Sequence, residues 1–379
     1  MKVVPRPFVL LTRNPLTVVC DKSSVEAAVT KLSLAPKALN DWMPAVSELL
    51  ISNVSLPLQF DDEYMLSCAY PVASTSVGWL TRITVMSNDH GIYCYVMTPF
   101  AKTGEVDLGA LKDYVEAIIQ SGVDGLTCIA STCEGAYLSE QERFDVTKAV
   151  CKIAGGRVRV NVGAGAISTR ESIRYAKHAE DGGATALMVD MQTYFPVTMD
   201  EAYRHYMAIA ESVTIPIRLY NIPAPNKFDF TPERLVQMAS ISRITSIKEA
   251  SGDVNRTRDI KALCGSRFAI FCGFHYMLLD AFRLGAVGWE AGLHPLIARL
   301  CVDLYRTLAV ERDAPKSERL FQQLLPLFTL FRYYGVPQTL KAMSVWSDIK
   351  LGDPRPPLSP LPPAQLKLLE QILRDLELI

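Results

Sequence analysis

Lys248 ends a short apolar stretch, residues 244–248, that has the length and composition of a buried strand. Burying an ammonium group is costly unless the charge is paired or the amine gives up its proton. A lysine in such a place either extends its amine to solvent or has a lowered pKa that lets the amine attack a carbonyl carbon. Tyr220 ends the preceding apolar stretch, residues 217–220. We expect its phenol to relay protons while a carbinolamine forms on Lys248 and collapses.

Two hydroxyl residues and a carboxylate follow other apolar stretches in the same way. Ser131 and Thr132 come after residues 125–129, and hydroxyls with neighbouring backbone N–H groups can hold a carboxylate without a full charge partner. Glu290 follows residues 286–289, where it is either a second acid or base that contacts substrate, or a rim residue facing water. A 2-oxo acid fits this set, because its ketone condenses with the lysine and its carboxylate meets the hydroxyls.

The elements that position these residues follow a regular alternation. Eight short apolar runs alternate with seven amphipathic stretches of helical length, the first run being residues 92–98 and the last residues 286–289. Because the runs are continuously apolar, both faces of each strand should be covered. We therefore predict an α/β fold, a closed (β/α)8 TIM barrel, in which working residues project from the carboxyl ends of the strands. An open doubly wound sheet is less well supported, since Gly163 and Gly165 are followed by Ser168 where a dinucleotide fingerprint needs a third glycine.

Regions outside this alternation suggest three parts to the chain. Residues 91–295 are the predicted catalytic barrel, and residues 296–379 are a helical region interrupted by a proline-rich connector at 353–363. Residues 1–90 do not share the pattern, and we expect an N-terminal extension without catalytic groups. It is either a small accessory domain, a poorly ordered segment, or upstream sequence before Met86 as an alternative start. Its first residues lack the apolar core of a secretory signal.

Composition narrows the class of protein. The chain has 379 residues, a net charge of −1 and no basic block, which disfavours nucleic-acid binding. No stretch is long enough in apolar residues to span a bilayer. Nine scattered cysteines without a C-x-x-C pair favour a reducing, cytoplasmic location and argue against a structural zinc site.

Several motifs, in order, resemble one known family. They are VMTPF (96–100), GVDGL (122–126), STCE (131–134), YNIP (220–223), IKEASGD (247–253) and RPPL (355–358). The chain from about residue 91 onward is similar to the dihydrodipicolinate synthase / N-acetylneuraminate lyase family of class I, Schiff-base-forming lyases. The resemblance implies Lys248 as the Schiff-base lysine, Tyr220 as the proton relay, and Ser131 and Thr132 as ligands of a pyruvoyl carboxylate. It implies no cofactor, and a homotetramer or dimer in which Tyr194 reaches a neighbouring subunit's site.

Four positions depart from the family pattern. Cys133 stands where the family has glycine, and Pro225 stands where dihydrodipicolinate synthases carry an arginine for the second substrate's carboxylate. Trp289 and Glu290 replace small or aliphatic residues. These departures count against lysine-biosynthetic activity itself and leave open a diverged barrel that binds a small acid with little turnover. A metal site made by His275, His294 and Glu290 matches no known ligand spacing, and we expect no metal.

Overall fold

The computed structural model describes residues 8–10, 17–19 and 89–379 of the chain. The chain divides into two units, Met1–Ser76 and Val77–Ile379. In the first, β1 (Phe8–Leu10) pairs antiparallel with β2 (Thr17–Val19). The expected N-terminal extension otherwise lies outside the described residues. The domain boundaries given above therefore remain predictions.

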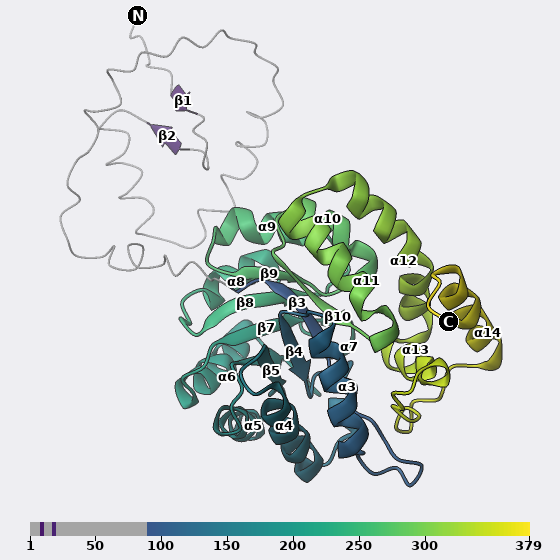
Figure 1. The fold of residues 1–379 in the computed structure, drawn as a ribbon. Helices are drawn as coiled ribbons and strands as arrows, with labels where there is room; N and C mark the ends of the chain where they lie inside the picture. The colour runs from purple at the N-terminus through teal and green to yellow at the C-terminus, as the bar shows by residue number, and fades with distance from the viewer. Residues whose placement is uncertain (1–7, 11–16, 20–88) are drawn as a thin grey trace, which may run out of the picture. The chain divides into compact units, whose positions relative to one another are not determined.

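The second unit contains a closed barrel of eight parallel strands, as the alternation of apolar runs predicted (Figure 1). In chain order the strands are β3 (Gly91–Tyr95), β4 (Gly125–Cys128), β5 (Arg159–Gly163), β6 (Ala186–Asp190), β7 (Ile217–Asn221), β8 (Ile244–Glu249), β9 (Ala269–Cys272) and β10 (Gly288–Gly292). Each strand pairs with its neighbours in sequence, and β10 closes the barrel against β3. The barrel prediction is confirmed, and most predicted strand bounds are within one residue of the observed ones. The larger differences are the end of the first strand, at Tyr95 rather than 98, and the last strand, which spans Gly288–Gly292 rather than 286–289.

Helices cover the outside of the barrel and follow the predicted stretches closely. They are α3 (Leu108–Gln120), α4 (Glu140–Ala154), α5 (Thr169–Asp181), α6 (Met199–Ser212), α7 (Pro223–Asn226), α8 (Pro232–Met238), α9 (Asn255–Cys264) and α10 (Leu278–Arg283). The start of α4 shows why such boundaries could be predicted. Ser139 accepts from the Glu142 backbone N–H, and Glu142 accepts from the Ser139 backbone N–H. This reciprocal pair satisfies two backbone donors that the helix leaves unpaired.

The chain ends in a helical region on one side of the barrel, coloured green to yellow in Figure 1. It comprises α11 (Pro295–Arg306), α12 (Ala314–Tyr334), α13 (Val336–Ala342) and α14 (Pro363–Asp375). The segment between α13 and α14 returns to the barrel, where the Leu351 carbonyl accepts from the Phe100 N–H at 3.0 Å. The region thus reaches the loop that follows β3.

The strand register sorts the inward-facing side chains into two levels. On β7, Arg218 lies opposite Ser246 of β8, and Tyr220 lies opposite Lys248. Because side chains two residues apart share a face of a strand, Arg218 and Tyr220 point to the same side at different heights. The lower level contains the charged side chain of Arg218. The upper level, nearer the carboxyl ends of the strands, contains Tyr220 and Lys248.

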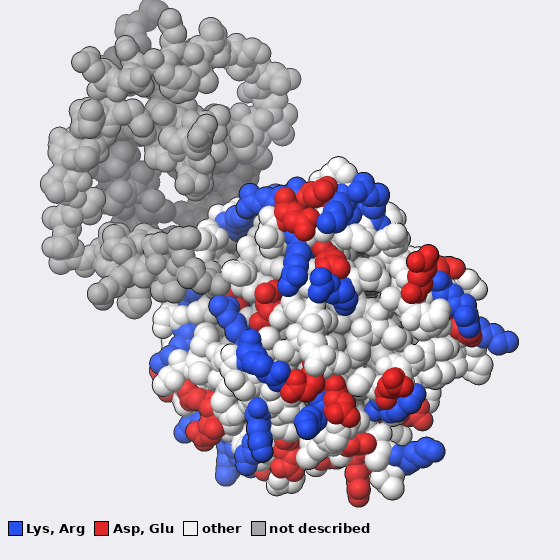
Figure 2. All heavy atoms as spheres, in the orientation of Figure 1, with Lys and Arg blue, Asp and Glu red and all other residues white. Residues whose placement is uncertain are grey.

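The exterior shows no concentration of one charge on the face drawn in Figure 2, where Lys and Arg are interspersed with Asp and Glu. Among the helices that the structure describes, none combines the length and apolarity needed to cross a membrane.

Candidate active site

Lys248 is buried in the upper level of the barrel, with 2% of its surface exposed. Its Nζ lies 2.5 Å from the Tyr95 hydroxyl and 3.9 Å from the centre of the Tyr220 ring. Removal from water lowers the pKa of Lys248 to about 8, although the Glu290 carboxylate acts in the opposite direction. About one tenth of the amine is therefore unprotonated at pH 7, and nucleophilic attack requires this unprotonated form.

Tyr220 lies between Lys248 and the loop that follows β4. Its ring faces the amine, and its hydroxyl is 3.3 Å from Ser131 Oγ. Burial raises the pKa of Tyr220, so the phenol stays protonated and can act as an acid. The structure thus brings Lys248, Tyr220 and Ser131 together, as the sequence led us to expect.

The Ser131–Thr132 loop has an unusual backbone. Ile129 and Glu134, on either side of it, both adopt φ of 61°. A positive φ is rare for a β-branched residue, and such conformations persist where the surrounding structure holds them. In the described part of the chain, the backbone N–H groups of Ser131 and Thr132 donate to no protein acceptor. Two free N–H groups beside two hydroxyls can receive an anionic oxygen.

The C-terminal helical region fixes this loop. Lys341 of α13 is buried and pairs with Glu134 Oε1 at 2.5 Å. The Arg355 backbone N–H donates to Glu134 Oε2 at 2.7 Å, and the Arg355 guanidinium pairs with Glu142. Cys133 is buried behind the loop, and its carbonyl accepts from Thr98 Oγ1 at 2.8 Å. The loop is therefore held by Thr98, which follows β3, and by Lys341 and Arg355, which lie more than 200 positions farther along the chain.

A cavity of about 360 Å³ opens at the carboxyl ends of β4 to β7. Ser131 and Tyr220 contribute to its wall, as do Asp190, Asn226 and Pro225. Asp190 Oδ2 accepts from Asn226 Nδ2 at 3.1 Å. Lys248 is not part of the wall and lies directly behind Tyr220. A bound molecule would meet the hydroxyls first and the amine at the inner end.

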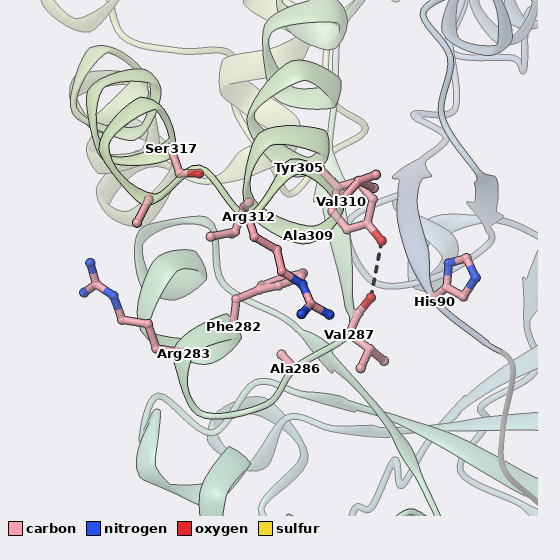
Figure 3. A pocket seen from close by; sticks show the side chains of 12 residues that line it. His90, Phe282, Arg283, Ala286, Val287, Tyr305, Ala309, Val310, Arg312 and Ser317 are labelled. Carbon is pink, nitrogen blue, oxygen red and sulfur yellow. Dashed lines mark hydrogen bonds between the residues drawn. The ribbon is translucent and has the colours of Figure 1, made fainter.

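A larger cavity, about 620 Å³, lies at the other end of the barrel (Figure 3). It lies next to the residues that precede β3 and β10, His90 and Val287, and Tyr305 donates to the Val287 carbonyl there at 3.3 Å. Figure 3 shows mainly aliphatic and aromatic side chains, with the Arg312 side chain extending among them and Arg283 to one side. None of the predicted site residues lines it, and it lies at the end opposite to the one where barrel enzymes place their chemistry.

Glu290 is not where the sequence suggested. Because β10 begins two residues later than predicted, Glu290 is the middle residue of the strand and points into the barrel, fully buried. It pairs with Arg218, and it accepts from Thr127 Oγ1 at 2.9 Å. Glu290 is therefore neither a rim residue nor on the cavity wall. Its carboxylate belongs to the charged level beneath Lys248.

Two residues of the site escaped the sequence analysis. Arg218 is a charged residue within the apolar run 217–220, the same signal that identified Lys248, and the structure shows it buried inside the barrel. Tyr95 is the last residue of β3, and its hydroxyl touches the amine. Tyrosine is common in strands, so its type alone gives no signal.

Comparison with known proteins places this geometry in a family. Residues 88–376 match the model of the dihydrodipicolinate synthetase family. The chain belongs to this family. It is 32% identical over 292 residues to a 4-hydroxy-tetrahydrodipicolinate synthase of Syntrophus aciditrophicus, covering 76% of this chain and 99% of that one. The 4-hydroxy-tetrahydrodipicolinate synthase structure from Methylacidiphilum fumariolicum superimposes with a TM-score of 0.73 at 28% identity, covering 76% and 96%. The dihydrodipicolinate synthase structure from Agrobacterium tumefaciens gives 0.71 at 29%, covering 76% and 98%.

Membership makes the protein an enzyme, a class I lyase of the Schiff-base type, and confirms the resemblance seen in its motifs. The remaining family positions lie as follows. Tyr194 is on the surface, 77% exposed, with its ring 5.0 Å from that of Phe195. Within one chain Tyr194 does not line the cavity, although Gln192 and Thr193 beside it do. Its role in a neighbouring subunit's site stays a prediction.

The two histidines considered as metal ligands have other partners. His275 Nε2 accepts from the Gly292 N–H at 3.0 Å, and burial lowers the pKa of His275 to about 3. His294 caps α11 by accepting from the Leu296 N–H. Within residues 8–10, 17–19 and 89–379, no three His, Cys, Asp or Glu side chains gather as metal ligands would.

Proposed function

We propose that the protein condenses pyruvate or another 2-oxo acid with Lys248 and then makes or breaks a C–C or C–O bond beside the imine carbon. The observation that carries this proposal is the buried amine of Lys248, with its pKa lowered to about 8, behind a cavity lined by hydroxyls. The iminium that forms is an electron sink, which stabilises negative charge developing on the adjacent carbon.

Each residue has a role in this proposal. Ser131 and Thr132 hold the 2-oxo acid's carboxylate through their hydroxyls and free N–H groups. The Tyr220 hydroxyl, hydrogen-bonded to Ser131, delivers the proton that lets the carbinolamine oxygen leave as water. Lys248, whose amine lies next to the Tyr220 ring, attacks the ketone carbon.

Reductive trapping tests the proposal directly. The protein is incubated with pyruvate, reduced with borohydride and digested, and the mass of the peptide carrying Lys248 is measured. We expect an adduct on Lys248 that is missing in Lys248→Met and present in Lys316→Met, since Lys316 is an exposed lysine on α12. If a broad panel of 2-oxo acids left Lys248 unmodified, the proposal would be wrong.

The relatives' names raise the possibility that the enzyme is a 4-hydroxy-tetrahydrodipicolinate synthase. Pro225 argues against it, because this position on the cavity wall carries no cationic group for the carboxylate of a second substrate. Its neighbours Asn226 and Asp190 offer hydrogen bonds to a neutral, hydroxylated group instead. We therefore favour aldol cleavage or dehydration of a longer 2-oxo acid. Formation of 4-hydroxy-tetrahydrodipicolinate at a rate like that of the Syntrophus enzyme, run in parallel, would contradict this choice.

We also propose a homo-oligomer, a dimer or tetramer, in which Tyr194 enters the site of a neighbouring subunit. The exposed pair of Tyr194 and Phe195 supports it, because two large aromatic side chains facing water are unfavourable in a monomer. Analytical ultracentrifugation of the wild type and of a Tyr194→Ala, Phe195→Ala double variant tests the assembly. A monomeric wild type would exclude it.

A further inference from the structure

The hydroxyl that touches the Lys248 amine belongs to Tyr95, not to Tyr220. Tyr95 Oη lies 2.5 Å from Lys248 Nζ, whereas the Tyr220 hydroxyl points to Ser131 and only its ring faces the amine. Tyr95 comes from β3, across the barrel from β8, and is 2% exposed. Its hydroxyl can donate to Met188 Sδ at 3.5 Å, which leaves the oxygen's lone pairs free for Lys248.

This contact is the amine's one polar side-chain partner among the described residues. Other charged or titratable groups act on Lys248 without a hydrogen bond, among them Glu290, Cys133, Cys272, Asp190, His275 and Tyr220, whose ring faces the amine. Burial raises the pKa of Tyr95 well above its usual value, so its hydroxyl remains a neutral phenol that accepts a hydrogen bond from nitrogen. A neutral oxygen beside a buried cation stabilises the charge without adding a second one.

We propose that Tyr95 is a catalytic residue whose hydroxyl oxygen accepts the hydrogen bond of the Lys248 nitrogen, first from the ammonium and then from the iminium formed with the 2-oxo acid. The inference rests on the Schiff-base function proposed above. It assigns the two phenols to different atoms of the reaction, Tyr95 to the nitrogen and Tyr220 to the departing oxygen.

The chemistry balances with this assignment. The neutral amine of Lys248 carries two hydrogens and the lone pair that bonds to the ketone carbon. One of these hydrogens passes to the carbonyl oxygen, a further proton reaches that oxygen through the Tyr220 hydroxyl, and the oxygen leaves as water. The other hydrogen stays on the iminium nitrogen together with the positive charge. That hydrogen needs an acceptor in a site closed to solvent, or the imine loses it and ceases to be an electron sink. Tyr95 Oη already occupies that position in the free enzyme.

The first test needs no substrate. Lysine labelled with ¹³C at Cε reports the Lys248 titration by NMR, with the signal assigned by its absence in Lys248→Met. Tyr95→Phe keeps the ring and removes the acceptor. Because the lost hydrogen bond favoured the charged form, we expect the titration midpoint to fall from about 8 by roughly one to two pH units. Tyr305→Phe, which removes a buried hydroxyl near the opposite end of the barrel, should leave the midpoint unchanged.

The second test follows the iminium. Borohydride trapping with pyruvate, measured against pH, should lose its alkaline end in Tyr95→Phe, where the imine is no longer held protonated. Tyr95→His keeps a neutral acceptor and should recover part of the wild-type range. If Tyr95→Phe failed to fold, 3-fluorotyrosine at position 95 would serve, since a poorer acceptor in the same place must move both profiles in the same direction.

The outcomes separate the two proposals. A wild-type adduct with unchanged profiles in Tyr95→Phe would overturn the role of Tyr95 and leave the Schiff-base function intact. If the wild type formed no adduct but Tyr95→Phe still shifted the NMR midpoint of Lys248, both the Schiff-base function and the iminium role would be overturned. Tyr95 would then be a positioning residue for the amine. A shift of both profiles supports the proposal as stated.

Discussion

Replacing Glu290 with glutamine should destabilise the protein substantially, although it changes one atom. Glu290 and Arg218 form an ion pair with both side chains almost fully buried, and the Arg218 guanidinium lies 3.4 Å from the centre of the Phe271 ring and 4.3 Å from that of Tyr93. Removing one charge from a buried pair leaves the other without compensation, which costs about 3–5 kcal/mol. Arg218 keeps its second partner, Asp89, at 2.7 Å. We therefore expect the lower end of that range, about 3 kcal/mol.

Urea unfolding provides the measurement. With a slope of about 3 kcal/mol per molar, a loss of about 3 kcal/mol moves the midpoint down by about 1 M. The matched control is Glu318→Gln, which breaks an ion pair with Arg283 whose side chains are 45% and 62% exposed. Such surface pairs contribute little, so we expect a change within about 0.5 kcal/mol. If the two variants unfolded at the same urea concentration, the argument that Arg218 needs Glu290 would be refuted.

The same substitution reports on Lys248. The Glu290 carboxylate raises the pKa of Lys248 and opposes the larger effect of burial. Its removal should lower that pKa below about 8, so the pH at which adduct formation with pyruvate is half-maximal moves down. A midpoint that rose in Glu290→Gln would contradict the placement of this charge beneath the amine.

Three further predictions use the same assays. In the wild type, the initial rate of adduct formation with pyruvate should rise with pH and level off above about 8, and well below 8 it should fall tenfold per pH unit. Stopped-flow or quenched trapping would measure this rate. A rate independent of pH between 6 and 8 would exclude Lys248 as the titrating amine. Tyr220→Phe should lower kcat by about 100-fold or more while the melting temperature changes by only a few degrees, because only the proton-donating hydroxyl is lost. Lys341→Met leaves Glu134 with a buried, uncompensated charge, so we expect about 3 kcal/mol of destabilisation by urea unfolding together with a raised KM; an unchanged KM would show that Lys341 does not hold the substrate loop.

Much of the fold could be predicted because its signals are local. Apolar runs of four to six residues, helical periodicity and a cap such as Ser139 each depend on a few neighbouring residues, and strand after strand of the barrel follows the same rule. The errors lie at the first and last strands. The predicted end of β3 at residue 98 extended an apolar run through Val96 and Met97, which are buried although they follow the strand. Burial marks the core, but it does not mark where the hydrogen-bonded ladder stops.

The sequence predicted only those site residues that lie at or just after the carboxyl ends of the predicted strands. Lys248, Tyr220 and Ser131 follow from the rule that parallel strands end at one edge, and they do lie together. Glu290 was misplaced because a shift of two residues moved it from the rim to the inside of the strand. Tyr95 could not be found, since its contact with Lys248 joins residues 153 positions apart and depends on closure of the barrel.

The charged level beneath Lys248 explains why its amine can serve near neutral pH. Arg218 is a second buried cation, and unpaired it would repel the ammonium; its pairing with Glu290 and Asp89 prevents this. Burial then lowers the pKa of Lys248 while Glu290 limits the fall, and the value settles at about 8. Compared with an ordinary lysine, the fraction of free amine at pH 7 rises about 300-fold. A pKa as low as about 6 would add only about another tenfold, because the amine would already be mostly free, and it would weaken the base that attacks the ketone. The Glu290 charge therefore leaves most of the gain in free amine in place while keeping the amine a stronger base.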